Sequence, residues 1–422
     1  MSISFRRKLF IFFVFVFLAV GTGVVYYSQG FRIDLSSFKI QKTGAIYVET
    51  SPRDVQIFLN QKEYRNNSGV LQRGTLLSDV LPKKYRLILK KDGFYDYEKN
   101  VEVFPSQVIR ILNALLVPQK IEKENALEEI KGDLLVDRLP TRETITQDTT
   151  KNIFYLYPAN TVASNLTSKI ASFLKLKITR INFFPGETDK FIVQTSKGIY
   201  GVDLKQQKAS PLIEGEIENF TFTDKNLYAV KIQKGKTTVT AREIVIYDLV
   251  LNKSITQEKL AAENKVADLK TSSDLLALLF ENGALWLYKF SDRTFLQIAH
   301  SAKQASFSPD NAKIVFQDKD GKVFVYLLSD DIISLETFKN NSLRVKITDA
   351  LKIEKIFFSD DSSHFIVVYP KQIYLAELTR HEPNNQFFIG DKKGSVLYSP
   401  KENKIYFIEN SSLEAIGLNF SE

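Results

Sequence analysis

The acidic segment DKDGK is the first place where this sequence offers chemistry. Asp318, Asp320 and Gly321 lie in it, between two predicted strands. Closely spaced carboxylates could form a calcium-binding turn, because Ca²⁺ prefers hard oxygen ligands. The segment has neither a third acidic ligand nor a downstream bidentate glutamate, so a type I′ hairpin turn explains it better. We therefore predict no metal site here.

Histidine and cysteine chemistry is nearly absent from the chain. It contains no cysteine and three histidines, His300, His364 and His381. The lack of cysteine excludes disulfides, thiolate metal sites and cysteine nucleophiles. The spacing of the histidines gives no metal-ligand motif, and no signature of a serine hydrolase, zinc peptidase or P-loop enzyme is present. We expect each histidine in a loop or at the surface, and predict no catalytic, cofactor-binding or metal-ligating residue and no enzymatic activity.

Aromatic side chains are the remaining candidates for binding. The chain has 32 phenylalanines, 18 tyrosines and one tryptophan, Trp286. Trp286 alternates with leucines on a predicted strand, which favours core packing over sugar binding. Tyr95 and Tyr97 follow a glycine turn, and we predict them as weak candidates for stacking on a glycan.

An apolar run near the N-terminus decides where these residues act. Residues 9–27 contain no charge and follow a basic cluster. About 20 apolar residues span the hydrocarbon core of a bilayer, and flanking basic residues favour the cytoplasmic side. We predict a single-pass helix in the plasma membrane, with a cytoplasmic N-terminus and an extracytoplasmic bulk. The predicted anchor residues are Arg6, Arg7, Lys8, Leu9, Tyr26 and Tyr27.

A cleaved secretory signal is the alternative interpretation of this run, because Ala19-Val20-Gly21 resembles a cleavage site. The apolar stretch continues beyond it to a tyrosine pair typical of a membrane interface, which favours an uncleaved anchor. The net charge of +8 includes three N-terminal basic residues, and no later basic run carries interleaved stacking aromatics. We therefore predict the lipid bilayer as a partner and exclude nucleic acid.

From residue 44 onward, apolar and polar residues alternate, which predicts a small β-sandwich or antiparallel sheet. The expected strands are 45–50, 55–59, 84–90, 97–104 and 108–117.

This segment resembles the PEGA domain, a β-sandwich module of bacterial and archaeal surface proteins. The matching residues are Gly44, Ser51-Pro52, Val55 to Leu59, Leu81-Pro82, Tyr85 to Leu89 and Gly93-Phe94. Asp54-Val55, Asn60-Gln61 and Lys83-Lys84 depart from the family pattern. The resemblance implies surface display or binding of an envelope polysaccharide, and it transfers no catalytic residue.

The rest of the chain repeats a unit of turn, strand and strand. Six aromatic-containing or polar turns, beginning at residues 184, 222, 271, 307, 358 and 398, recur about every 43 residues. A period of 40–50 residues with strands alone is typical of four-stranded propeller blades. With the strand at 153–157, the count is about seven blades, and six or eight remain alternatives. Phe307-Ser308-Pro309-Asp310 resembles the TolB-like, WD-type repeat, with Asn311 in place of its glycine.

The predicted fold is all-β, with a transmembrane helix, a PEGA-like β-sandwich and a β-propeller of about seven four-stranded blades. We predict a bacterial envelope protein that binds a protein partner or a cell-wall or surface polysaccharide. The alternative is a propeller-type carbohydrate-active hydrolase or lyase with carboxylates on separate blades; a sensor would need a partner inside the cell. The predicted segments are a cytoplasmic region (1–8), a helix (9–27), a connector (28–43), a sandwich (44–117), a charged, weakly helical linker (118–131) and the propeller (132–422).

Overall fold

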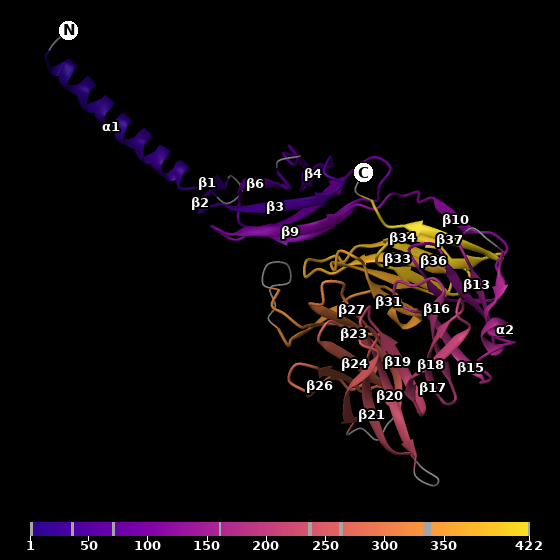
Figure 1. The fold of residues 1–422 in the computed structure, drawn as a ribbon. Coiled ribbons are helices and arrows are strands. Elements are labelled where there is room, and N and C mark those ends of the chain that lie inside the picture. The colour runs from indigo at the N-terminus through magenta and orange to yellow at the C-terminus, as the bar shows by residue number, and fades with distance from the viewer. Residues whose placement is uncertain are drawn as a thin grey trace.

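The computed structural model describes residues 3–34, 38–69, 72–159, 162–234, 239–260, 265–331 and 339–420. The chain begins with a long helix, α1 (Ile3–Ser28), that stands away from two packed β-units (Figure 1). Phe5–Ser28 is long and apolar enough to cross a membrane, and none of it is buried within the protein; a signal sequence has the same properties. The prediction of an all-β fold with an apolar N-terminal helix is confirmed.

A short hairpin joins the helix to the first β-unit. Its strands are β1 (Phe31–Asp34) and β2 (Lys39–Lys42), which the sequence did not predict within the connector. The first unit then packs a three-stranded sheet, in the order β6-β3-β9, against a four-stranded sheet, in the order β5-β4-β7-β8. The strand bounds are β3 (Gly44–Ser51), β4 (Gln56–Leu59), β5 (Lys62–Tyr64), β6 (Gly74–Val80), β7 (Lys84–Lys90), β8 (Tyr97–Glu102) and β9 (Val108–Leu115).

Five of these strands lie where the alternation of the sequence predicts them, and β5 and β6 were missed. β6 contains Gly74 and exposed residues, so its pattern of burial is irregular. β3 pairs with β9 in parallel, so the sheet is mixed rather than purely antiparallel. At the start of β3, Gly44 lies close to the connection between β8 and β9, because a Cβ at that position would lie 2.3 Å from the Phe104 carbonyl oxygen.

The described part of the remaining chain forms seven four-stranded antiparallel sheets arranged as propeller blades. Blades 1 to 4 contain β11 (Leu134–Arg138), β12 (Thr144–Asp148), β13 (Ile153–Tyr157) and β14 (Ser164–Asn165); β15 (Ile178–Phe183), β16 (Lys190–Thr195), β17 (Gly198–Asp203) and β18 (Lys208–Glu214); β19 (Glu216–Phe222), β20 (Asn226–Lys234), β21 (Val239–Asp248) and β22 (Lys253–Leu260); and β23 (Val266–Ser272), β24 (Leu275–Phe280), β25 (Leu285–Lys289) and β26 (Thr294–Ala299). A short helix, α2 (Leu166–Ala171), follows β14.

Blades 5 to 7 complete the ring. They contain β27 (Ala302–Phe307), β28 (Lys313–Asp318), β29 (Val323–Leu327) and β30 (Ser342–Val345); β31 (Lys355–Phe358), β32 (His364–Val368), β33 (Gln372–Glu377) and β34 (Gln386–Asp391); and β35 (Val396–Ser399), β36 (Lys404–Glu409) and β37 (Ser412–Gly417) with β10 (Lys123–Leu127). The six recurring turns of the sequence each join the first two strands of blades 2 to 7. The predicted number of about seven four-stranded blades is confirmed.

The propeller begins at β10, earlier in the sequence than the predicted start at residue 132. Residues 118–131 are not a weakly helical linker, because β10 pairs antiparallel with β37 as the outermost strand of blade 7. Its charged residues bind the same blade: Lys123 lies 2.8 Å from Glu409, and Lys404 lies 2.5 Å from Glu124. The first strand of the propeller therefore closes the ring together with the last three.

Polar side chains of the inner strands bridge neighbouring blades. The bridges connect Asp137 to the Phe183 N–H (3.0 Å), Arg180 to the Phe220 carbonyl (3.1 Å), Asn219 to the Ala267 carbonyl (2.9 Å), Gln304 to the Ile356 N–H (3.1 Å), Lys355 to the Val396 carbonyl (3.1 Å), and Ser395 to the Leu135 N–H (2.7 Å). Each bridge satisfies a backbone group at the inner edge of a blade. These side chains therefore hold the ring together.

One hydrophobic core joins the sandwich to blades 6 and 7. It includes Leu87 and Val101 of the sandwich together with Ile366, Phe387 and Phe407 of the propeller. At its edge the fully buried Lys99 forms an ion pair with Glu377 and donates to the Pro383 carbonyl at 2.5 Å. Because the two β-units share a core and a buried ion pair, the sandwich is fixed on the propeller (Figure 1).

Candidate functional site

The predicted glycan-stacking pair lies at the junction between the sandwich and the propeller. Tyr97 is buried in the shared core, so it is closed to a ligand and the prediction for this residue is wrong. Tyr95 is half-buried, and its ring centre lies 5.9 Å from that of Phe387 in blade 6. Both tyrosines therefore pack the two β-units together.

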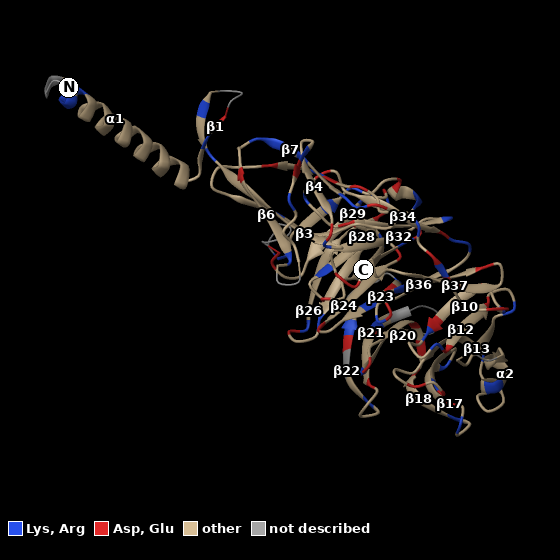
Figure 2. Ribbon diagram, turned by 90° about the horizontal axis from the view of Figure 1, so that it is seen from above, with Lys and Arg blue, Asp and Glu red and all other residues tan. Residues whose placement is uncertain are grey.

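The predicted anchor residues occupy the two ends of α1. Arg6, Arg7, Lys8 and Leu9 are exposed in its first turns, and Tyr26 and Tyr27 are exposed at its other end. Figure 2 shows that this second end of α1 leads into β1. The basic and aromatic ends are thus separated by the apolar length of the helix.

The histidines and the DKDGK turn all lie in the propeller. His300 is exposed, whereas His364 is buried, contrary to expectation, with its Nδ1 2.5 Å from Asp361. Asp318 accepts a hydrogen bond from the Lys322 N–H at 2.7 Å across the turn between β28 and β29. Gly321 has a positive φ of 82°, while Asp320 does not have one, so the turn differs from the predicted type I′.

The inner strands bring charges near the axis of the propeller. Burial lowers the pKa of Arg180, and the neighbouring Asp268 and Asp137 oppose that effect. Burial raises the pKa of Asp137, which accepts hydrogen bonds from Phe183 and Asn182. These carboxylates are therefore engaged by a cation and by backbone groups. Among the described residues, no group of three or more His, Cys, Asp or Glu is placed to hold a metal ion.

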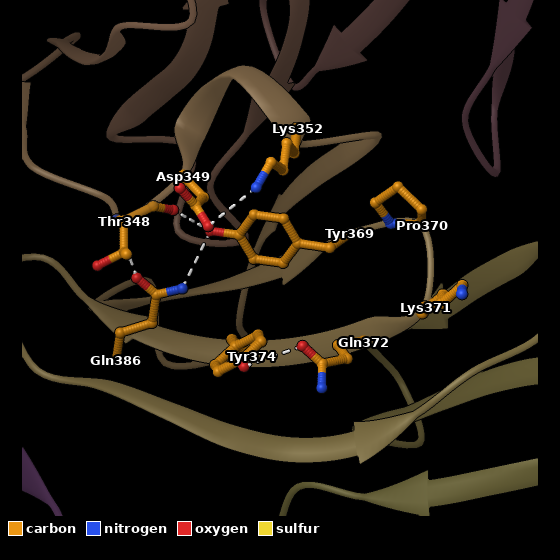
Figure 3. A pocket seen from close by; sticks show the side chains of 9 residues that line it. All are labelled: Thr348, Asp349, Lys352, Tyr369, Pro370, Lys371, Gln372, Tyr374 and Gln386. Carbon is orange, nitrogen blue, oxygen red and sulfur yellow. Dashed lines mark hydrogen bonds and ion pairs between the residues drawn. The ribbon is translucent and has the colours of Figure 1, made fainter.

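A cleft of about 390 Å³ between blades 5 and 6 is the candidate functional site (Figure 3). Three segments form it: the connection between the blades at 348–352, the turn between β32 and β33 at 369–372, and the start of β34 at Gln386. Pro370 lies second in the turn, where its fixed φ is favourable, and the Tyr369 N–H donates to the Gln372 carbonyl at 2.8 Å.

Strand alternation places the aromatic wall of the cleft. Ile373 and Leu375 of β33 are buried in the shared core, so Tyr374 between them lies on the opposite face, half-buried. Its ring meets that of Tyr369 edge to face, with centres 5.5 Å apart. Such an arrangement is favourable because the positive edge of one ring contacts the negative face of the other. The two rings thus form an aromatic wall of the cleft.

A hydrogen-bond network holds the base of the cleft. The Tyr369 hydroxyl donates to the Thr348 carbonyl and accepts from Gln386 Nε2 at 3.0 Å. Gln386 Oε1 in turn accepts from the Thr348 N–H at 3.1 Å. Burial raises the pKa of Tyr369, so this residue stays a neutral donor. Figure 3 shows these groups converging on the tyrosine hydroxyl.

Charged and amide groups line the rim of the cleft. Lys352 Nζ lies 3.3 Å from Asp349, and both side chains are exposed. Lys371 and Gln372 are also exposed, and Gln372 Oε1 accepts from the Tyr374 hydroxyl at 3.1 Å. Aromatic faces beside amides and ammonium groups suit a ligand with apolar ring faces, hydroxyl groups and negative charge.

Of the comparisons with known proteins, the one with solved structures finds similarity, and those by sequence do not. No protein-family model matches the chain, and no curated protein matches it. Among solved structures, an oligogalacturonate lyase in complex with manganese is similar, with a TM-score of 0.47 and 13% sequence identity, over 71% of this chain and 93% of the lyase. The resemblances to the PEGA domain and to TolB-like repeats stay predictions.

The lyase structure corrects the prediction that the protein is not an enzyme, because the similar structure is that of an enzyme. At 13% identity the likeness identifies no reaction, ligand or residue in this chain.

Sequence reasoning missed the cleft between blades 5 and 6. Its residues come from positions 348 to 386, and no short motif contains them. The available signal is the turn Tyr369-Pro370-Lys371-Gln372 followed by Tyr374, where two tyrosines flank polar residues between buried strands.

Proposed function

We propose that this chain is a single-pass plasma-membrane protein whose β-units lie outside the cell, and that it binds an envelope polysaccharide in the cleft between blades 5 and 6. The observation that carries the binding proposal is the pair of packed tyrosines beside amide and ammonium groups in that cleft. The exposed apolar helix with a basic end and an aromatic end supports the membrane anchor.

The orientation gives the first expected result. The chain has no native cysteine, so single cysteines report on their own position. V250C, at an exposed site of blade 3, should react in intact cells with a maleimide that cannot cross the membrane. K8C should react only after the cells are permeabilised, because the basic residues before the helix stay in the cytoplasm. The reverse pattern would contradict the proposed topology.

Polysaccharide binding gives the second expected result. Y374A should weaken binding of the full chain in nanodiscs to its polysaccharide about tenfold, the equivalent of about 1.4 kcal/mol. Tyr374 is half-buried and forms the aromatic wall together with Tyr369, so the substitution removes an aromatic face of the cleft. Binding is measured against purified peptidoglycan, a polyuronate and a neutral glucan.

The matched control is Y200A. Tyr200 is the third residue of β17 in blade 2, as Tyr374 is the third residue of β33 in blade 6, and it is also half-buried. Y200A should leave affinity unchanged. Equal losses in the two variants, or binding to none of the three polymers, would contradict the assignment of the cleft.

A carbohydrate-active lyase or hydrolase is the second candidate function. The cleft favours the lyase, because it combines Asp349, Lys352, Lys371 and the phenol of Tyr374, groups that can neutralise a carboxylate and take up a proton. It contains one carboxylate, whereas glycoside hydrolysis usually uses two. Incubation with a polyuronate should then release an unsaturated product that absorbs in the ultraviolet, and this activity should be lost in Y374A.

A further inference from the structure

The hairpin β1–β2 has one apolar face and one polar face. Phe31 and Ile33 alternate with Arg32 and Asp34 on β1, and Ile40 lies between Lys39 and Gln41 on β2. The pairing places Ile33 directly opposite Ile40. Because side chains alternate between the two faces of a strand, Phe31, Ile33 and Ile40 share one face.

Within the described chain, only the Phe31 end of this apolar face is partly covered, and the rest is exposed. Ile33 is 62% exposed, Ile40 is 64% exposed and Phe38, next to β2, is 85% exposed. Two strands of four residues form the whole sheet in the described part of the molecule. An isolated two-stranded hairpin is only marginally stable in water, so its apolar face requires a partner.

The polar face, by contrast, is tied to the protein. Arg32 donates to the Tyr27 carbonyl at 2.8 Å, lies 3.7 Å from the centre of the Tyr27 ring, and pairs with Asp79 of the sandwich at 2.8 Å. Arg32 thus links the end of α1, the hairpin and the sandwich. The hairpin is held in place from one side, and its apolar side faces outward.

The position of the hairpin beside α1 indicates what can cover its apolar face. Only two residues separate the end of α1 at Ser28 from the start of β1 at Phe31, a span of about 10 Å. The polar zone of a bilayer beyond its hydrocarbon core is about 5–8 Å deep on each side. Figure 2 shows the hairpin projecting sideways from the end of α1, away from the propeller.

We infer that the apolar face of the β1–β2 hairpin inserts into the outer interface of the membrane that α1 crosses. Phe31 already packs edge to face on Tyr26, with ring centres 5.3 Å apart, so the apolar surface of the helix continues into the hairpin. Lys42 lies opposite Phe31, where its alkyl stem can lie along the membrane while its ammonium group reaches the headgroups. This second contact fixes the orientation of the sandwich and propeller above the membrane. The inference rests on the proposed anchor and is independent of the ligand of the cleft.

Single-cysteine labelling of the full chain tests this inference. An environment-sensitive fluorophore is attached to I40C, K39C or V16C, and each labelled protein is placed in mixed phosphatidylcholine–phosphatidylglycerol vesicles. Lys39 is adjacent to Ile40 on the opposite face of β2, and Val16 lies in the middle of α1. The label at I40C should emit at shorter wavelength, be quenched by spin-labelled lipid, and be several-fold less quenched by aqueous iodide than the label at K39C.

A second variant removes the apolar pair without touching Arg32. In I33S/I40S, a label at F38C should lose its lipid contact, while V16C stays in lipid. Equal iodide quenching at I40C and K39C, with V16C in lipid, would overturn the hairpin inference and leave the anchor standing. Labels that are exposed to water at all three sites, I40C, K39C and V16C, would overturn both the hairpin inference and the proposed membrane anchor.

Discussion

E377Q should lower the free energy of unfolding of the full chain by about 3–5 kcal/mol at pH 6. Glu377 is buried in blade 6 and forms an ion pair with the fully buried Lys99 of the sandwich. Removing one partner of a buried pair leaves the other charge in a low-dielectric interior without compensation. Urea unfolding of the chain in detergent micelles, followed by circular dichroism, measures the change.

The sandwich supplies a matched control for this substitution. Lys90 and Asp96 form an ion pair of 2.8 Å in the same unit, with both side chains about half exposed. D96N should change the free energy of unfolding by less than about 1 kcal/mol. The double variant K99M/E377L should recover most of the stability, because apolar residues of similar size replace the pair. A loss in E377Q no larger than in D96N would show that the junction does not depend on the pair.

The same pair gives a dependence on pH with a defined sign. Burial lowers the pKa of Lys99 to about 7 from its ordinary value of 10.5. Between these two values the unfolded chain binds more protons than the folded chain, so the stability contributed by Lys99 rises with pH. The free energy of unfolding of the wild type, relative to K99M/E377L, should therefore increase from pH 7 to pH 10. A flat or falling difference would contradict the lowered pKa.

Regular alternation and repetition made most of the fold predictable from the sequence. Strand β7 matches its predicted bounds, 84–90, and the recurring turns place the blades because each turn must join two buried strands. Burial of one face imposes that pattern wherever a strand lies on a core.

Features that depend on contacts between distant residues were not predictable in this way. The segment at 123–127 reads as charged and weakly helical, yet it forms a strand because β37 offers an open edge more than 280 residues later. Tyr97 was expected at a surface and is buried in the core that the sandwich shares with the propeller. The cleft between blades 5 and 6 likewise exists only once the connection at 348–352 meets the turn at 369–372.

Replacing β10 with a Gly/Ser segment of equal length should lower the free energy of unfolding by about 4 kcal/mol. The change removes the ion pairs of Lys123 and Glu124 and the packing of Leu127 on blade 7. It also adds glycines, which lose more chain entropy on folding. It also exposes the edge of β37, which promotes pairing between molecules.

The outermost strand of blade 4 provides the comparison that isolates ring closure. β26 is also exposed and also ends its sheet, but it follows its own blade directly in the sequence. The same replacement at 294–298 should raise hydrogen exchange only within blade 4. Replacement of β10 should raise exchange in β11 of blade 1 as well as in β35, β36 and β37, because Ile130 and Leu135 share one hydrophobic cluster with Tyr406 and Leu413. Exchange confined to blade 7 would mean that the ring closes without β10, through the contacts between β11 and β35 and the bond from the Leu135 N–H to Ser395, just before β35.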